Sequence, residues 1–260
     1  MAATHSSAPL LTRLLLDGSN SSAALVNSMD EPFEGWKNHE REFRSYSNRF
    51  YKRSLRPDEY VLNLRGEPVV PPLGYQRLQN EAACLMFIRR TTNIPVPDVL
   101  GAYDDDGAFV LVTQRLPGVR MDKLCPEDQT VVMKEVESHI QALQNLRSTC
   151  TGGPSGLVCP PQRGTQYFPK GTPWSARSSP GLDFVFCHCD LSQSNIMVNS
   201  ETLKIEGIID WEYAGYWPAF FESPFFRSPR PSGAQFRDEA GNCQFIDFLH
   251  GSKHKAESKA

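Results

Sequence analysis

The sequence predicts an α+β protein in two lobes, a small strand-rich N-terminal lobe and a larger, mainly helical C-terminal lobe. Short apolar runs between turn residues are frequent in the first half, and a long amphipathic helix begins the second half. A proline–glycine pair, Pro117-Gly118, separates the two. We therefore place a hinge at Gln114–Gly118 and expect a poorly ordered segment at 1–30, an N-terminal lobe at 31–116 and a C-terminal lobe at 117–260.

The length and composition agree with such a protein and exclude some partners. A chain of 260 residues is long enough for two modest lobes that share a cleft. The net charge of −3, without a basic stripe, argues against a nucleic-acid partner. No apolar run reaches the ~18 residues of a membrane span, so no membrane partner is expected. The sequence does not indicate an oligomeric state.

The seven cysteines are odd in number and loosely spaced, which is typical of a reducing compartment such as the cytoplasm. Cys187-His188-Cys189 could indicate zinc. However, no second C-x-x-C or H-x-x-x-H pair completes four ligands, so we do not expect a zinc site.

The N-terminal lobe is predicted to contain a helix within residues 31–60, followed by a strand near Arg49–Ser54. Four prolines make residues 55–74 an extended loop. Tyr75–Arg90 then reads as a helix, because its apolar residues recur on one face: Leu78, Ala82, Leu85 and Met86. Two strands are expected to flank the turn DDDG, at Val99–Tyr103 and Ala108–Thr113.

The C-terminal lobe begins with the strongest helix of the chain, within Cys125–Ser148. Pro126 stands in its first turn, and its buried stripe is predicted to be Val132, Val136, Ile140 and Leu143. Residues 150–182, rich in Gly, Pro and Ser, form a long connection. Three short apolar strands follow, DFVFC, NIMVN and KIEGIID, and a helix near QFIDFLH closes the chain.

The strongest functional signal is the segment VFCHCDLSQSNIMVNSETLKIEGIIDWEYAG. It contains the pattern H-x-D-x-x-x-x-N at His188, Asp190 and Asn195, and Asp210 ends an apolar strand fifteen residues later. Phosphoryl transfer needs metal ions on the phosphates and a carboxylate that orients the attacking hydroxyl. Asn195 and Asp210 offer oxygen ligands suited to Mg²⁺, and Asp190 can accept the substrate proton.

This segment resembles the catalytic core of the aminoglycoside phosphotransferase and choline kinase-like family, especially its fungal group. CHCDLSQSNIMV and IIDWEYAGYWP carry the resemblance, and IPVPDVLGAY, LVTQRLPG and GGPSG add to it over residues 50–248. It implies a two-lobed protein-kinase-like fold and an ATP- and Mg²⁺-dependent phosphotransferase that moves the γ-phosphoryl group to a hydroxyl of a small molecule. The acceptor itself is not readable.

The resemblance also implies a role for each matching residue. Asp190 would be the catalytic aspartate, Asn195 and Asp210 would bind the metal, and His188 would be structural. Glu81 would pair with the nucleotide-binding lysine. The adenine would meet the backbone of the hinge at Gln114, Arg115 and Leu116.

The sequence supplies its own argument for the partner of Glu81. Glu81 lies on the apolar face of its helix, and a buried carboxylate needs a partner. Only Lys37 and Lys52 precede it. Lys37 stands in a polar stretch, whereas Lys52 follows Phe50-Tyr51 in a predicted strand, so we favour Lys52 for the nucleotide site.

Two departures from the family pattern keep an alternative open. No G-x-G-x-x-G precedes Lys52, and DGSNSS at 17–22 is a poor substitute. The chain is also short, which leaves open a shortened N-terminal lobe. The alternative is therefore a catalytically weak kinase-like binding module. A metal-dependent phosphoesterase would need more ligands than the sequence offers, and a protein kinase would need D-F-G and A-P-E segments that are missing.

Several other polar residues have two interpretations. Glu212 could support the metal or the substrate, or form a solvated salt bridge. Glu222, Asp238 and Glu239 could attract a cationic acceptor or be exposed charges. Residues 160–180 and the segment after Trp217 are candidates to face the acceptor. Trp211, Tyr213, Tyr216 and Trp217 are expected to form an aromatic core beneath the catalytic loop.

Overall fold

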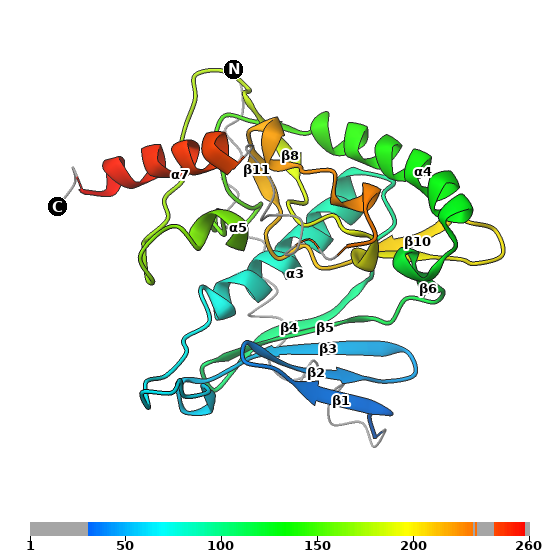
Figure 1. Cartoon of the computed structure of the whole chain (residues 1–260), viewed down its shortest axis with the longest axis horizontal. Helices are drawn as coiled ribbons and strands as arrows, with labels where there is room; N and C mark the ends of the chain where they lie inside the picture. Colours follow the sequence, from blue (N-terminus) through cyan, green and yellow to red (C-terminus); the bar gives the residue numbers. More distant parts are fainter. Residues whose placement is uncertain (1–30, 231, 233–241, 258–260) are drawn as a thin grey trace.

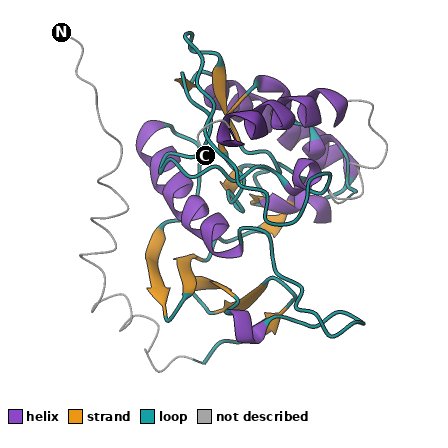
Figure 2. Cartoon of the chain, turned by 90° about the vertical axis from the view of Figure 1, so that its left-hand side faces the viewer, coloured by secondary structure: helices purple, strands orange, loops and turns teal. Residues whose placement is uncertain are grey.

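The computed structural model of the chain describes residues 31–230, 232 and 242–257. The expectations about residues 1–30 and about Asp238 and Glu239 therefore lie outside the described residues. A five-stranded sheet forms one end of the molecule, and the long helices and two three-stranded sheets form the other (Figure 1). The side view of Figure 2 shows the same division. We call the first part the sheet region and the second the helical region.

The sheet region is antiparallel throughout, with the order β1-β2-β3-β5-β4. Its strands are β1 (Glu34–Lys37), β2 (Arg41–Ser45), β3 (Arg49–Ser54), β4 (Val99–Asp105) and β5 (Ala108–Gln114). The last three were predicted within two residues.

The helix expected before β3 is wrong, because β1 and β2 occupy that segment. Its aromatic residues explain why. Trp36 on β1 stacks on Phe43 of β2 with ring centroids 5.0 Å apart, and Phe50 of β3 lies 6.2 Å from Phe43. Alternation along paired strands brings such rings to one face, and the ring contacts across the strands outweigh the weak helical pattern of the segment.

Helix α3 (Gly74–Thr91) joins the two regions, as Figure 1 shows. It has the predicted apolar face, with Leu78, Ala82 and Leu85 buried, whereas Met86 is only partly buried. The loop before it contains a short 3-10 helix at Pro57–Glu59. Because α3 packs on the sheet and also contributes to the main hydrophobic core, a polar residue on its inner face can reach both regions.

The helical region contains helices α4 (Pro126–Gln144), α5 (Gln162–Thr165) and α7 (Asn242–Glu257). Its strands form two antiparallel sheets. The first has the order β10 (Ile205–Ile208), β9 (Ile196–Val198), β6 (Val119–Arg120), and the second β11 (Gly215–Trp217), β8 (Phe184–Cys187), β7 (Arg147–Ser148). Further 3-10 helices span Met121–Lys123, Gln193–Asn195, Ala219–Phe221 and Phe225–Arg227. None of the helices described is long and apolar enough to cross a membrane.

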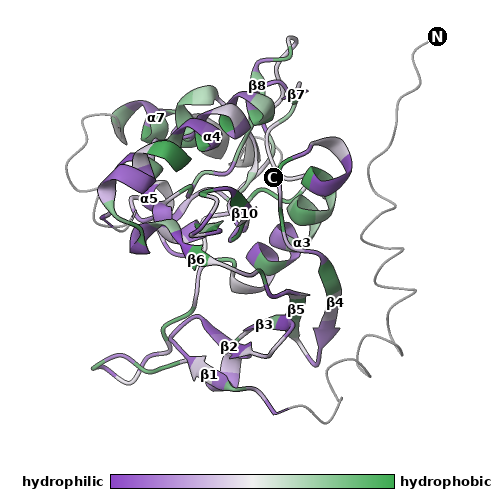
Figure 3. Cartoon of the chain, turned by 90° about the vertical axis from the view of Figure 1, so that its right-hand side faces the viewer, coloured by the Kyte–Doolittle hydropathy of each residue, from purple (hydrophilic) through white to green (hydrophobic). Residues whose placement is uncertain are grey.

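Hydrophobic and hydrophilic residues alternate around α3 and α4, as Figure 3 shows. In α4 the predicted stripe is buried at Val132, Val136 and Leu143, and Ile140 packs against it while partly buried. The predicted aromatic core is also present, because Trp211, Trp217 and Tyr213 are buried. Tyr216 is partly buried and packs edge-on against Phe186. These aromatic contacts support the loops that contain Asp190 and Asp210.

Gly118, at the predicted hinge, is a position where glycine is required. Its φ is +85°, and a Cβ built on it would lie 2.3 Å from the carbonyl oxygen of Val198. Gly107 in the β4–β5 turn has a similar φ of +80° but open space around it. We therefore expect Gly118→Ala to lower the free energy of unfolding well beyond the ~1 kcal/mol that the positive φ alone costs in Gly107→Ala. Denaturant unfolding of both variants measures this, and equal losses would contradict the predicted clash.

Candidate active site

The catalytic segment lies where two strands of different sheets end. Residues 188–195 lead from β8 to β9, and Asp210 directly follows β10. Cys189 and Asp210 both have a left-handed backbone, with φ of 71° and 69°. Non-glycine residues in this region store strain that is concentrated at functional sites. The amide nitrogen of Asn195 donates to the Asp190 carbonyl oxygen at 2.8 Å, so these two residues are held together.

Lys52 joins the sheet region to this segment. Its Nζ lies 2.6 Å from Oε1 of Glu81 on α3 and 2.9 Å from Oδ1 of Asp210. The ion pair favoured from the sequence is therefore present, and a second carboxylate completes it. Burial alone would lower the pKa of Lys52, but the two carboxylates outweigh burial and raise this pKa above its ordinary value. Burial would raise the pKa of Asp210, but Lys52 and Arg41 hold it well below the ordinary range.

Asp190 has a different environment from Asp210. Burial, together with the neighbouring Asp210 charge, raises the pKa of Asp190 to about 7. Two carboxylates with divergent pKa values in one site are the arrangement expected when one holds cations and the other handles a proton.

His188 is structural in its contacts, as the resemblance implied. It is fully buried, its Nε2 lies 3.0 Å from the Ile209 carbonyl oxygen, and its Nδ1 accepts the N–H of Asp190 at 3.3 Å. Its ring also lies 4.6 Å from that of Trp211. Burial lowers the pKa of His188 to about 4, which keeps the imidazole neutral at physiological pH. The histidine thereby ties the Asp190 backbone to the strand end at Ile209.

Glu222 is not free to attract a cationic acceptor, so that interpretation is wrong for this residue. Its Oε2 accepts the backbone N–H of His188, and its Oε1 is buried without a partner in the described part of the chain. Burial raises the pKa of Glu222 to about 7, although the hydrogen bond from His188 opposes the shift. Glu222 therefore fixes the backbone at the start of residues 188–195.

This raised pKa predicts how stability depends on pH. A carboxyl whose folded pKa lies above the ~4.5 of the unfolded chain binds more protons when folded, so its contribution to stability falls as pH rises from about 4.5 to 7. Glu222→Gln keeps an acceptor for His188 and removes the titration. We expect the free energy of unfolding of this variant, relative to wild type, to rise by roughly 2 kcal/mol from pH 5 to pH 8.

Taking the difference between the two proteins in chemical denaturation cancels the opposite contribution of His188, whose depressed pKa makes stability rise with pH between about 4 and 6.5. A constant difference across this range would contradict the assignment to Glu222.

Glu212 is buried, so the interpretation as a solvated salt bridge is wrong, whereas its support of the metal or the substrate stays a prediction. Its Oε2 pairs with Nη2 of Arg41 on β2 and lies 3.6 Å from Nε of Arg77 on α3. All three side chains are buried. The sequence analysis missed both arginines, although Arg77 stands four residues before Glu81, on the same helix face. Carboxylate oxygens of Glu81, Asp210 and Glu212 lie within 4.8 Å of one another. The basic side chains that pair with these acids are Arg41 on β2, Lys52 on β3 and Arg77 on α3.

The hinge residues have partly committed backbones. The N–H of Gln114 donates to the Asp98 carbonyl oxygen at 2.8 Å, and that of Arg115 donates to Asn48 at 3.0 Å. A Cβ placed on Gly207 of β10 would lie 2.3 Å from Leu116 Cδ1, so glycine at this position makes room for the Leu116 side chain. The N–H groups of Gln114 and Arg115 are therefore engaged within the protein.

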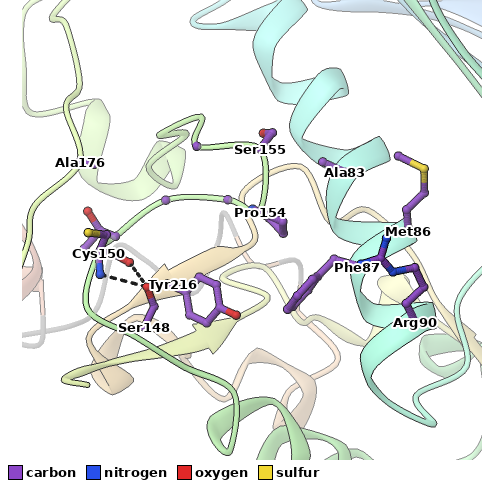
Figure 4. Close-up of a pocket in the computed structure, with 14 residues that line it drawn as sticks. Ala83, Met86, Phe87, Arg90, Ser148, Cys150, Pro154, Ser155, Ala176 and Tyr216 are labelled. Carbon is purple, nitrogen blue, oxygen red and sulfur yellow. Dashed lines mark hydrogen bonds between the residues drawn. The ribbon is translucent and has the colours of Figure 1, made fainter. Parts of the chain in front are cut away.

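Two cavities lie along α3. The larger, of about 640 Å³, is lined by the start of α3, by Tyr213 and by residues 156–174, which include much of the stretch expected to face the acceptor. The other, of about 410 Å³, lies behind α3 and is lined by Met86, Phe87 and Tyr216 among others (Figure 4). Asp190, Asn195 and Asp210 line neither cavity.

Comparison with known proteins agrees with this geometry. Residues 165–223, which contain the catalytic segment, match the model of the phosphotransferase enzyme family. A comparison with curated proteins gives no match. The resemblance to aminoglycoside phosphotransferases is confirmed at the level of the family, whereas the fungal group stays a prediction.

Solved structures support the fold. The chain resembles the aminoglycoside phosphotransferase APH(3″)-Id from Streptomyces rimosus, with 16% identity, a TM-score of 0.52 and coverage of 88% of this chain and 91% of that one. It also resembles a mutant aminoglycoside 2′-phosphotransferase-IIIa in complex with GDP, with 11% identity, a TM-score of 0.51 and coverage of 94% and 96%. The chain thus has the fold of these phosphotransferases.

Proposed function

We propose that this protein is an ATP-dependent phosphotransferase that moves the γ-phosphoryl group to a hydroxyl of a small molecule. The contact of Lys52 with both Glu81 and Asp210 carries the proposal. It places a fixed cation beside a carboxylate that is 31% exposed, at the end of the segment containing Asp190 and Asn195. Phosphoryl transfer depends on such positioned charges more than on covalent chemistry.

The sheet region offers a surface for the base of the nucleotide. Phe43 pairs directly with Lys52 in the β2–β3 register, so the two side chains share a face of the sheet. Trp36 and Phe50 complete an aromatic cluster on that face, and Trp36 is 44% exposed. Stacking on such rings and contact with the hinge at Gln114, Arg115 and Leu116 would hold a purine. One similar structure is a GDP complex, so both ATP and GTP are candidates in a direct test.

The residues present fit a magnesium ion. Asp210 offers a carboxylate, and Asn195 has its amide nitrogen engaged by Asp190, which leaves its carbonyl oxygen as a ligand. Both are the oxygen donors that Mg²⁺ prefers. When bound, the ion would neutralise charge on the phosphates. Asp210 and Asn195 would hold it, and Lys52 would contact the phosphates directly.

Asp190 would orient the acceptor hydroxyl and take its proton. Its backbone is fixed twice, by His188 Nδ1 at the N–H and by Asn195 at the carbonyl. This leaves the carboxylate directed by a rigid loop, as general-base catalysis requires. The cavity lined by residues 156–174 is the proposed location of the acceptor.

The two regions would then be the two lobes of a kinase-like fold. We propose residues 31–116 as the nucleotide lobe and 117–260 as the catalytic lobe, with the hinge between them. A nucleotide bound in the cleft would contact β2, β3, α3 and the segment after β10, which come from both sides.

A catalytically weak binding module is the second candidate. The turn between β1 and β2, Asn38–Glu40, contains no glycine. This favours weak nucleotide binding, because a glycine-rich loop offers free backbone N–H groups to phosphates. The complete set of Lys52, Glu81, Asp190, Asn195 and Asp210 favours the enzyme instead.

Calorimetric titration of the full chain with ATP and with GTP, each with and without Mg²⁺, tests the proposal. We expect Mg²⁺-dependent binding of at least one nucleotide, followed by transfer of labelled γ-phosphate in a screen of small alcohols. Absence of binding at millimolar nucleotide would favour the binding module.

A further inference from the structure

The β1–β2 turn lies where a kinase-like fold would need donors for the phosphates, yet it uses its own amide groups internally. Asn38 Oδ1 accepts the backbone N–H groups of Glu40 and Arg41, each at 2.8 Å. The Glu40 carboxylate accepts Nη2 of Arg77 at 2.5 Å. A glycine-rich loop offers free backbone N–H groups to phosphate oxygens. This turn cannot offer the two at Glu40 and Arg41 while the Asn38 bonds are intact.

The side chain of Arg41 points into the same site. The β2–β3 register pairs Phe43 with Lys52, and Arg41 lies two residues before Phe43, so it shares the face of Lys52. Its Nη2 contacts Glu212, one oxygen of which lies within 4.8 Å of an oxygen of Asp210. Arg41 is only 4% exposed. A guanidinium therefore stands beside the lysine and the metal-binding carboxylate.

Arg41 also has unused hydrogen-bonding capacity. Its Nε is buried and has no hydrogen-bond partner within the described residues. A buried donor without a partner costs free energy, and this cost is recovered when an acceptor arrives. Planar guanidinium groups bind phosphate through paired N–H groups.

The ion pair with Glu212 does not prevent this role. Glu212 also lies 3.6 Å from Nε of Arg77, which is itself held by Tyr213 and Glu40. If Arg41 turned from Glu212 to a phosphate, the buried carboxylate would keep a cation beside it. The release of Arg41 therefore leaves no unpaired buried charge, which is the usual reason that such pairs stay closed.

We propose that Arg41 is a second phosphate-binding cation of this site, which exchanges Glu212 for the phosphates of the nucleotide and replaces the backbone donors of a glycine-rich loop. This inference rests on the proposed nucleotide-binding function and adds a residue to it. Arg41 then acts with Lys52 on the phosphates, and the β1–β2 turn closes on the nucleotide through a side chain.

Calorimetry of the full chain with ATP and with adenosine, both with Mg²⁺, tests the inference, because only ATP carries phosphates. We expect Arg41→Gln to weaken ATP binding about 10- to 100-fold, the range for a charge-assisted hydrogen bond, with little effect on adenosine. Arg44→Gln is the matched control. Arg44 is on the same strand but contacts Glu42 and the ring of Tyr51, away from Lys52, and should leave the ATP affinity unchanged.

The double variant Arg41→Gln with Glu212→Gln guards against misfolding, since it removes both partners and keeps the net charge of the cluster. It should fold and show the same selective loss for ATP. Equal losses for ATP and adenosine, or an unchanged ATP affinity in the folded variants, would overturn the role of Arg41 alone. Failure of the wild type to bind ATP would overturn the proposed function and this inference with it.

Discussion

Replacement of Asp190 by asparagine is expected to lower the rate of phosphoryl transfer by about 10²–10⁴-fold, the usual contribution of a positioned general base. The asparagine side chain has the same size, and the backbone contacts with His188 and Asn195 do not depend on the carboxylate. The variant should therefore fold and bind nucleotide like the wild type. Transfer of labelled phosphate from ATP, to an acceptor or to water, measures the effect under single-turnover conditions.

A matched control for this experiment is Asp122→Asn, which removes a surface carboxylate that pairs with Arg120. We expect its transfer rate to equal that of the wild type within experimental error, because exposed pairs contribute little. If Asp190→Asn transferred phosphate as fast as this control, Asp190 would not be the base, and the catalytic segment would need another assignment.

Replacement of Asp210 by asparagine is expected to abolish the stabilisation of the protein by ATP and Mg²⁺. In the wild type, nucleotide at 100 times its dissociation constant should add about 2.7 kcal/mol to the free energy of unfolding, or roughly 5–10 °C to the melting temperature. In the variant, Lys52 keeps Glu81 as its partner at 2.6 Å. The carboxylate that would hold the ion is lost, so the Mg²⁺-dependent part of the shift should disappear.

Thermal unfolding with and without nucleotide, and with and without Mg²⁺, measures this effect. Asp98→Asn provides the control. It removes an exposed carboxylate, just before β4, that pairs with Arg89 of α3. A full Mg²⁺-dependent shift in Asp210→Asn would show that the ion is held elsewhere. The cluster of Glu81 and Glu212 would then be the next candidate.

Local patterns in the sequence predicted the parts of the fold that depend on short-range order. Helices α3 and α4 follow from apolar residues that recur every three to four positions, and β4 and β5 follow from apolar runs around the turn at Asp106-Gly107. The helix expected before β3 was wrong. There the strands depend on rings of Trp36, Phe43 and Phe50, which are separated in the sequence and meet only across the sheet.

The candidate site shows the same distinction. The spacing of His188, Asp190 and Asn195 along one loop is a property of the sequence, and so is the amphipathic position of Glu81. The choice of Lys52 over Lys37 could be made from the surrounding residue types. The structure contains the predicted ion pair between Lys52 and Glu81. It adds a contact between Lys52 and Asp210.

Residue types and spacing thus determined by themselves which side chains we propose for the phosphate chemistry, because the motif lies within one short loop and the two strands that flank it. Only the tertiary structure decided how Glu212, Glu222, Arg41 and Arg77 are used. The sequence did not indicate the partner of any of them, yet burial makes each depend on a partner between 34 and 171 positions away. A buried charge must find a counter-charge or a hydrogen bond, and that partner is chosen by the packing of elements against one another rather than by neighbours in the chain.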